Sequence, residues 1–490
     1  MIGLAHLGGP IACLGLALLL VARTQRERLA GLGFAAFGAC VLGAAVAPHT
    51  HVVLLVGGVL AALGLGLGLA LAYRRFPWLL PLAALACVPV RIGVHLGGAS
   101  TKLLVPLYVV IGGATILLAW DLASGDRRTR ELRAAAWPLA LYLAWTGLSI
   151  SWSRDVTEGA VELLAFYVPF TLLAICLARL PWSRLGLRLL LLELTAMGLA
   201  FAVVGFYQYD TRNIFENPKL GVSNAYAPFF RVNSVFWDPS IYGRFLVISM
   251  APLVVLVALQ RSLRLSLAAA AALVVLWAGL LISFSQSSFA ALLVVVIGVA
   301  FAVWRWRALL AVVLAFAVLA GIAVAQPQVR RQLQRHTTHG LNQASSGRAS
   351  LVAQGIRIAK AHPVRGVGVG GFKRAYAQRV HLKGKNPKKA ASHDTAVTVA
   401  AETGAPGLVL FVWLLVALLR QAFRRAGPVG LVAGLGIAAI FAHSLFYNDF
   451  FEDPLTWMLV GLVALASPLV VPVRRRAPAA QVEQREAVPV

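Results

Sequence analysis

The sequence predicts an all-α polytopic membrane protein with about 15 transmembrane helices and a large, partly helical extracytoplasmic loop. Of the 490 residues, 60% are hydrophobic and only 13% are charged, whereas a soluble domain is about 45–50% apolar and about 25% charged. Apolar runs of about 17–25 residues, long enough to cross the hydrocarbon core as a helix, recur from end to end of the chain.

The predicted spans lie at 2–22, 29–47, 52–72, 77–97, 102–120, 134–150, 160–178, 187–207, 241–259, 265–283, 286–303, 308–325, 394–419, 429–446 and 455–472. We interpret the first as a span and not as a cleaved signal, because Arg23, Arg26 and Arg28 follow its apolar run instead of preceding it. The four cysteines lie inside apolar runs, without the spacing of a disulfide framework or metal site.

Alternate connections are rich in arginine, which orients the chain. The groups that fall on one side are Arg23/Arg26/Arg28, Arg74/Arg75, Arg127/Arg128/Arg130/Arg133, Arg179/Arg184/Arg188, Arg261/Arg264, Arg305/Arg307, Arg420/Arg424/Arg425 and Arg474/Arg475/Arg476. By the positive-inside rule this side is the cytoplasm, with the N-terminus outside and 473–490 as a disordered cytoplasmic tail. These groups account for part of the net charge of +26.

Two long connections, 208–240 and 326–392, lie on the predicted outer side. They contain Trp, Phe and Tyr at densities unlike those of disordered segments, and loops of this length are usually functional. The cytoplasmic connections contain no Walker A or kinase signature, which argues against an ATP-driven pump. We therefore expect any chemistry to be extracytoplasmic.

The connection 326–392 has fourteen Lys and Arg residues and no Asp or Glu. It is either a solvated loop resting on anionic headgroups or a site for a phosphorylated lipid or substrate, since guanidinium groups clamp phosphate oxygens. Nucleic acid is a third possibility, but no recognition fold fits the loop. A helix is predicted over 349–361, followed by a glycine-rich string over 366–371 that forms an anion cradle or a plain turn. A second helix over 372–380 directs Lys373 toward headgroups or substrate.

Five residues stand out as candidates on the outer side. His393, at the start of a span, is either a general base for a hydroxyl or a capping or interfacial side chain. Glu402 lies within that span and should face the bundle interior, and Arg91 lies near the outer end of its span. Asp238 precedes a proline, which is typical of a helix N-cap. No capping role of this kind is expected for Arg231. Further outer polar groups are Ser287, Ser288, His443, Asn448, Asp449, Glu452 and Asp453.

These segments resemble the O-antigen ligase and O-antigen polymerase superfamily, integral membrane glycosyltransferases that use lipid-diphosphate-linked glycans. The ligase signature is matched in spacing by His393, Gly404 and Gly407, with Asp394 where the family has an amide or hydroxyl residue. Phe289 stands where many members have an arginine. Phenylalanine cannot bind phosphate, so the role of that arginine either falls to another residue or is absent here.

Two further segments carry the resemblance. Residues 231–243 are similar to the family's Arg-x-x-x-x-Phe-x-x-Pro-x-x-x-Gly segment, and residues 346–348 with 362–368 are similar to its large-loop motif. The resemblance covers 77–472 as a twelve-helix core with 326–392 between its ninth and tenth spans. It leaves 1–76 as three extra N-terminal helices.

The resemblance implies transfer of a glycan from a polyprenyl-diphosphate donor to a hydroxyl of an acceptor glycan or glycolipid. The transfer would occur at the outer face of the inner (plasma) membrane, among membrane lipids, without cofactor, metal or nucleic acid. The implied roles are His393 as general base, Arg231, Arg348, Arg91 and Arg365 on the diphosphate, and Asp238, Asp394, Glu402 and Lys373 in support. The alternatives are a polymerase with a second lipid-linked glycan as acceptor, a transporter or flippase for a lipid-linked sugar, and a non-catalytic scaffold.

Overall fold

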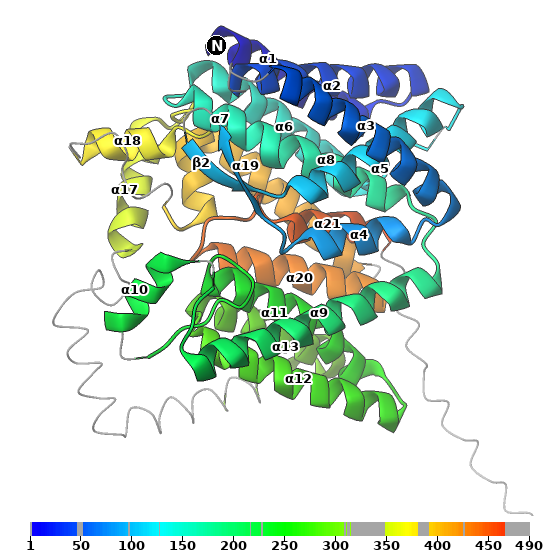
Figure 1. Cartoon of the computed structure of the whole chain (residues 1–490), viewed down its shortest axis with the longest axis vertical. Helices are drawn as coiled ribbons and strands as arrows, with labels where there is room; N and C mark the ends of the chain where they lie inside the picture. The colour runs from blue at the N-terminus through cyan, green and yellow to red at the C-terminus, as the bar shows by residue number, and fades with distance from the viewer. Residues whose placement is uncertain are drawn as a thin grey trace, which may run out of the picture.

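A computed structural model describes residues 2–46, 52–96, 99–126, 128–215, 217–226, 229–307, 310, 314, 348–380, 392–424 and 427–465 of the chain. Almost all regular structure in these residues is helical, and the long helices run side by side as a bundle (Figure 1). The predicted tail over 473–490 and nearly all of the predicted span 308–325 lie outside the described residues.

The helices that occupy predicted spans are α1 (Ile2–Val21), α2 (Gln25–Val46), α3 (Val52–Arg75), α5 (Val105–Ala123), α6 (Ala136–Ser149), α9 (Arg184–Thr211), α11 (Pro239–Leu259), α12 (Leu263–Ser283), α13 (Gln286–Trp304), α19 (Thr395–Arg424), α20 (Pro428–Ser444) and α21 (Pro454–Val463). One further span is continuous through α7 (Val156–Glu162), the π-helical turn η3 (Leu163–Tyr167) and α8 (Val168–Arg179). Among the described residues, nine helices are long and apolar enough to cross a membrane. The chain is therefore a multi-pass helical membrane protein.

The prediction of an unbroken helical span over 77–97 is wrong. The helix α4 (Leu79–Cys87) is only nine residues long, and it is followed by the antiparallel strands β1 (Ile92–Leu96) and β2 (Ala99–Leu103). Pro89 explains the early end, because proline has no N–H and its ring clashes with the preceding turn of a helix. Arg91 therefore lies in the connection between α4 and β1 and not within a span.

The connections predicted to be cytoplasmic meet in space. Arg28 forms an ion pair with Glu131 at 2.6 Å, and Arg179 pairs with Asp126 at 2.7 Å and also with Glu131. These residues come from three of the arginine-rich connections, so the tertiary structure brings those connections to the same region of the bundle.

Three helices outside the spans lie together at one end of the bundle (Figure 1). They are α10 (Pro218–Tyr226), α17 (Arg348–Ala361) and α18 (Phe372–Arg379). The two helices predicted in the basic loop are confirmed as α17 and α18, whereas α10 was not expected from the sequence. The described parts of both long outer connections thus share one end of the molecule.

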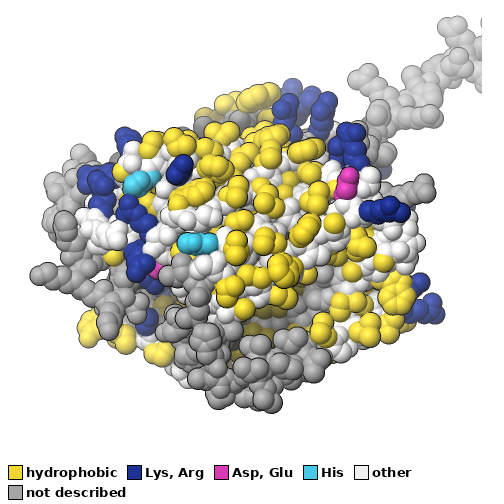
Figure 2. Space-filling view, turned by 90° about the horizontal axis from the view of Figure 1, so that it is seen from above, with side chains coloured by type: hydrophobic (Ala, Val, Ile, Leu, Met, Phe, Trp, Pro, Cys, Tyr) yellow, Lys and Arg dark blue, Asp and Glu magenta, His cyan; other side chains and the backbone are white. Residues whose placement is uncertain are grey.

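One face of the bundle shows a broad band of hydrophobic side chains, with Lys and Arg gathered toward its edges (Figure 2). On α1 and α2, large apolar side chains such as Leu7, Phe34 and Phe37 are exposed. An exposed apolar surface of this extent is unfavourable in water and favourable against lipid tails. The arrangement is that of a bundle surrounded by lipid.

Candidate active site

His393 stands at the beginning of α19 in a conformation that few residues adopt. Its φ is +62°, in the left-handed region, where His is one of the better-tolerated residues other than glycine. The next residue, Asp394, caps the helix by accepting a hydrogen bond from the Val397 N–H at 3.0 Å. Burial raises the pKa of the Asp394 carboxyl, and that backbone hydrogen bond partly opposes the rise. Asp394 is thus a helix cap that holds the half-buried His393 at the start of the helix.

The signature glycine Gly404 marks a break in α19. Its φ of +70° and ψ of −171° are not helical, and a Cβ placed there would lie 2.3 Å from the Val364 carbonyl oxygen. The Ala405 N–H beyond the break donates to the Pro363 carbonyl at 2.7 Å, and Trp145 Nε1 donates to the Thr403 carbonyl at 2.7 Å. Glycine is required because φ lies in the left-handed region and because Pro363 and Val364, just before the glycine-rich loop, pack directly against the broken helix.

The glycine-rich loop is not an anion cradle. Its N–H groups donate within the protein: Val367 to the Ala401 carbonyl at 2.9 Å, Gly368 to the Glu402 carbonyl at 2.8 Å, and Val369 to Ser149 Oγ at 3.1 Å. The Phe372 N–H, just beyond the loop, donates to the Glu402 carboxylate at 3.2 Å. Glu402 faces the interior as predicted, and one of its tasks is to hold this loop.

Arg231 is anchored at the entrance to α11. Its backbone exchanges hydrogen bonds with the Asn224 side chain at 2.8 and 3.2 Å, and its Nε donates to the Ser283 carbonyl at 3.2 Å. Seven residues on, Asp238 caps α11 as predicted, accepting from the Ser240 N–H at 2.7 Å. These contacts fix Arg231 beside Asp238 at the ends of α10 and α12.

Arg348, the first residue of α17, lies close enough to act on Arg231. Burial lowers the pKa of the Arg231 guanidinium, the Asp238 carboxylate raises it, and the positive charge of Arg348 lowers it again. Within the described part of the chain, Arg231 Nη1 and Nη2 have no hydrogen-bond acceptor. Two guanidinium groups that lower one another's pKa are stabilised by an anion that both can reach.

Tyr447, in the connection between α20 and α21, joins the candidate residues. Its ring centroid lies 6.4 Å from that of His393 and 5.8 Å from that of His443. Burial and the nearby carboxylates of Asp238 and Asp449 raise the pKa of the Tyr447 hydroxyl, while Arg244 and Arg91 oppose the rise. Tyr447 therefore carries a neutral hydroxyl on a ring that lies beside His393 and interacts electrostatically with Arg231 and Arg91.

The loop that carries Tyr447 is held by a buried ion-pair cluster. Arg244 of α11 pairs with Asp449, and its Nε lies 2.7 Å from Asp453 Oδ2. All three side chains are at most 8% exposed. Burial raises the pKa of the Asp449 carboxyl to about 6, while Arg244 opposes the rise. His443 lies next to the cluster, with its Nδ1 3.9 Å from Asp449 Oδ1 and its Nε2 3.1 Å from the Ser240 carbonyl oxygen.

Two residues predicted for the site, Arg365 on the diphosphate and Lys373 in support, have their contacts elsewhere. Arg365 is exposed and its guanidinium lies 6.0 Å from the centre of the Trp152 ring, while Trp152 Nε1 donates to the Arg365 carbonyl at 2.9 Å. Lys373 on α18 interacts electrostatically with Glu158 of α7. Phe289, in place of the family's arginine, packs against the hydrophobic core.

Sequence reasoning missed Tyr447 altogether and missed the pairing of Arg244 with Asp449 and Asp453. An available signal was the position of Arg244 within an apolar run, because a charge inside a span is almost always paired or functional. Tyr447 had no such signal, since a tyrosine at the end of a span is typical of any membrane protein.

A comparison with protein families covers part of the candidate site. No curated protein matches the chain. Residues 271–412 match the family model described as O-antigen ligase, and this stretch contains His393, Gly404, Gly407 and Arg348. The match supports an enzyme of the O-antigen ligase or polymerase type that acts on lipid-linked glycans. Over residues 271–412, which include the start and the break of α19, the chain is thus similar to the O-antigen ligase family.

Proposed function

We propose that this protein transfers a glycan from a polyprenyl-diphosphate carrier to a hydroxyl of an acceptor glycan or glycolipid at the outer face of the membrane. The observation that carries the proposal is that Arg231 and Arg91 interact electrostatically with Tyr447, whose ring lies 6.4 Å from that of His393, and that Arg348 acts on Arg231. These residues come from distant parts of the sequence, and they combine an anion site with a group that accepts a proton.

The proposed chemistry divides into two tasks. Arg231 and Arg348, assisted by Arg91, bind the diphosphate and neutralise the charge that develops as it leaves. His393 takes the proton of the acceptor hydroxyl, whose oxygen bonds to the anomeric carbon while the bond from that carbon to the diphosphate oxygen breaks. The electron pair of that bond stays on the diphosphate, which leaves on its lipid.

The test is to incubate the purified protein with a labelled lipid-diphosphate oligosaccharide and candidate acceptors, without added metal or nucleotide. A ligase yields a new glycoconjugate and free lipid diphosphate. A polymerase yields the lipid diphosphate and a longer lipid-linked glycan. Movement of the donor across a vesicle membrane without bond cleavage would overturn the proposal in favour of a transporter. If neither movement nor cleavage is observed, the non-catalytic scaffold is the remaining alternative.

Arg231→Lys should weaken the diphosphate site while preserving its charge. Lysine cannot present the paired N–H donors of a guanidinium, nor reach the Ser283 carbonyl in the same way. A loss of about 1.5–3 kcal/mol for a hydrogen bond to a charged group corresponds to roughly 10- to 150-fold weaker donor binding. The loss of affinity is measured by binding of a radiolabelled lipid-diphosphate glycan to the purified variant and to the wild type.

Arg261→Lys is the matched control, because Arg261 is exposed in a predicted cytoplasmic connection. Equal donor binding by Arg231→Lys and wild type would remove Arg231 from the diphosphate site.

A further inference from the structure

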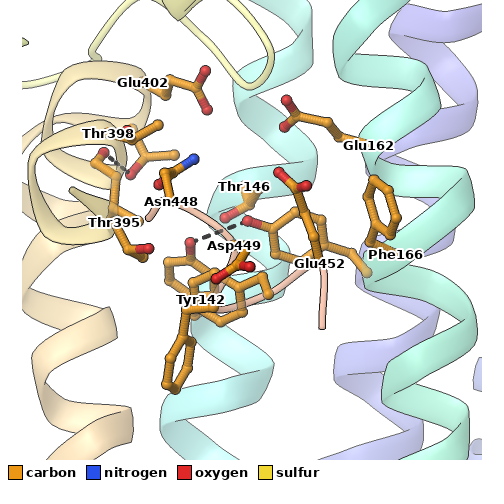
Figure 3. A pocket seen from close by; sticks show the side chains of 15 residues that line it. Tyr142, Thr146, Glu162, Phe166, Thr395, Thr398, Glu402, Asn448, Asp449 and Glu452 are labelled. Atoms are coloured by element: carbon orange, nitrogen blue, oxygen red, sulfur yellow. Dashed lines mark hydrogen bonds between the residues drawn. The ribbon is translucent and has the colours of Figure 1, made fainter. Parts of the chain in front are cut away.

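A small cavity lies beside the candidate site and is lined by carboxyl groups from three segments. Its volume is about 40 Å³, which is room for water. Glu162 comes from α7, Glu402 from α19, and Glu452 from the connection that also carries Tyr447. Figure 3 shows Glu162 and Glu402 facing one another across the space, with the Glu452 carboxyl directed toward them from below. We name this space the carboxyl cavity.

The carboxyl cavity also has a hydrophilic wall that points to bound water. Thr395 lines it and is only 2% exposed, yet its Oγ1 has no hydrogen-bond partner among the described residues. A buried hydroxyl without a partner is costly unless water satisfies it. Asn448 lines the cavity as well, next to Tyr447 in the sequence. Thr395 and Asn448 thus connect the cavity with the two segments that carry His393 and Tyr447.

A metal ion does not account for the three carboxyl groups. Nowhere in the described part of the chain do three His, Cys, Asp or Glu side chains lie in an arrangement that could hold one. Carboxylates that share a buried site repel one another, so ionisation of one favours a bound proton on another. Burial raises the pKa of the Glu452 carboxyl to about 7, and the neighbouring charge of Asp449 adds to the rise.

We propose that the carboxyl cavity takes up the proton that His393 removes from the acceptor hydroxyl. This inference rests on the proposed function. The proton would pass from the His393 imidazole, by water bound at Thr395 and Asn448, to the Glu452 carboxylate, and leave to solvent before the next turnover. His393 is thereby returned to its neutral form, in which it can accept another proton.

The pH dependence follows from the groups around Glu452. Those that face it are Glu158 and Glu162 of α7, Glu402 of α19, Asp449 of its own connection, Tyr142, Tyr167, Arg91 and Arg244. Below pH 7 Glu452 already holds a proton and cannot accept another, and above pH 7 it is ionised and can. Turnover should therefore rise with pH through about 7.

Glu452→Gln tests the inference, since glutamine keeps the size of the side chain and cannot take up the proton. Infrared spectroscopy of the substrate-free protein should show a protonated-carboxyl band that titrates near pH 7, and E452Q should lose that band. Turnover should fall by up to about 10²-fold, with loss of the dependence around pH 7 and unchanged donor binding. Glu27→Gln, an exposed change on the predicted cytoplasmic side, is the matched control and should retain both band and activity.

The two readouts separate the possible failures. An unchanged band or unchanged pH profile in E452Q overturns the proton-uptake role while leaving glycan transfer intact. Absence of transfer by the wild type with a titrating band present would instead overturn the proposed function. If E452Q does not fold, Glu162→Gln reports on the same shared proton and should also alter the band.

Discussion

Replacing His393 with alanine should abolish glycan transfer while leaving donor binding intact. A positioned general base contributes roughly 10²–10⁴-fold to the rate, and Arg231 and Arg348, which we assign to the diphosphate, belong to other segments. Transfer is measured with labelled donor and acceptor, and binding is measured separately with donor alone.

Two controls make this prediction specific. Because His393 has a φ of +62°, alanine adds backbone strain as well as removing the imidazole. His393→Asn avoids this, since asparagine tolerates the left-handed region. Both variants should be equally inactive, and His6→Ala, which removes an imidazole from α1, should be fully active. Activity in His393→Asn would assign the role of this residue to backbone geometry and not to proton transfer.

Replacing Arg244 with methionine should destabilise the protein by about 3–5 kcal/mol, because it leaves two carboxylates buried without their counter-charge. Arg244 is 3% exposed and pairs with both Asp449 and Asp453. The connection that holds Tyr447 against His393 should loosen as well, so transfer activity should fall together with the midpoint of thermal unfolding in detergent.

The rescue variant distinguishes charge from packing. Adding Asp449→Asn and Asp453→Asn to Arg244→Met removes the uncompensated carboxylates and should recover much of the lost stability. Arg261→Met, an exposed arginine, should change stability by less than about 0.5 kcal/mol. If the triple variant recovers no stability, the loss in Arg244→Met comes from poor packing of methionine and not from the uncompensated carboxylates.

Much of the fold was predictable because the hydrocarbon core of a membrane restricts which backbone structures can cross it. Every backbone polar group must be paired inside the hydrocarbon, so long apolar runs become helices, as in α9 or α13. The exception over 77–97 is instructive. Its hydropathy is that of a span, but Pro89 ends the helix and a β-hairpin follows, so composition alone overestimated the helix there.

The candidate site was predictable only in part. His393, Arg231 and Arg348 carry recognisable local patterns, and Asp238 and Glu402 behave as their positions indicate. The glycine-rich string over 366–371 left both an anion cradle and a plain turn open, and its N–H groups donate to carbonyl and hydroxyl oxygens of the same chain. Whether N–H groups point to a ligand or to the protein depends on what packs against them, and the sequence does not contain that information.

The sequence by itself determined that this is a multi-pass helical membrane protein with a basic, partly helical outer loop, because hydropathy and charge act along the chain. Only the tertiary structure decided that Tyr447 lies beside His393 and within electrostatic reach of Arg91, and that Glu162, Glu402 and Glu452 share one cavity. The three glutamates are up to 290 residues apart, since Glu162 precedes Glu452 by that distance. Their meeting depends on how the helices pack, and no local pattern records that packing.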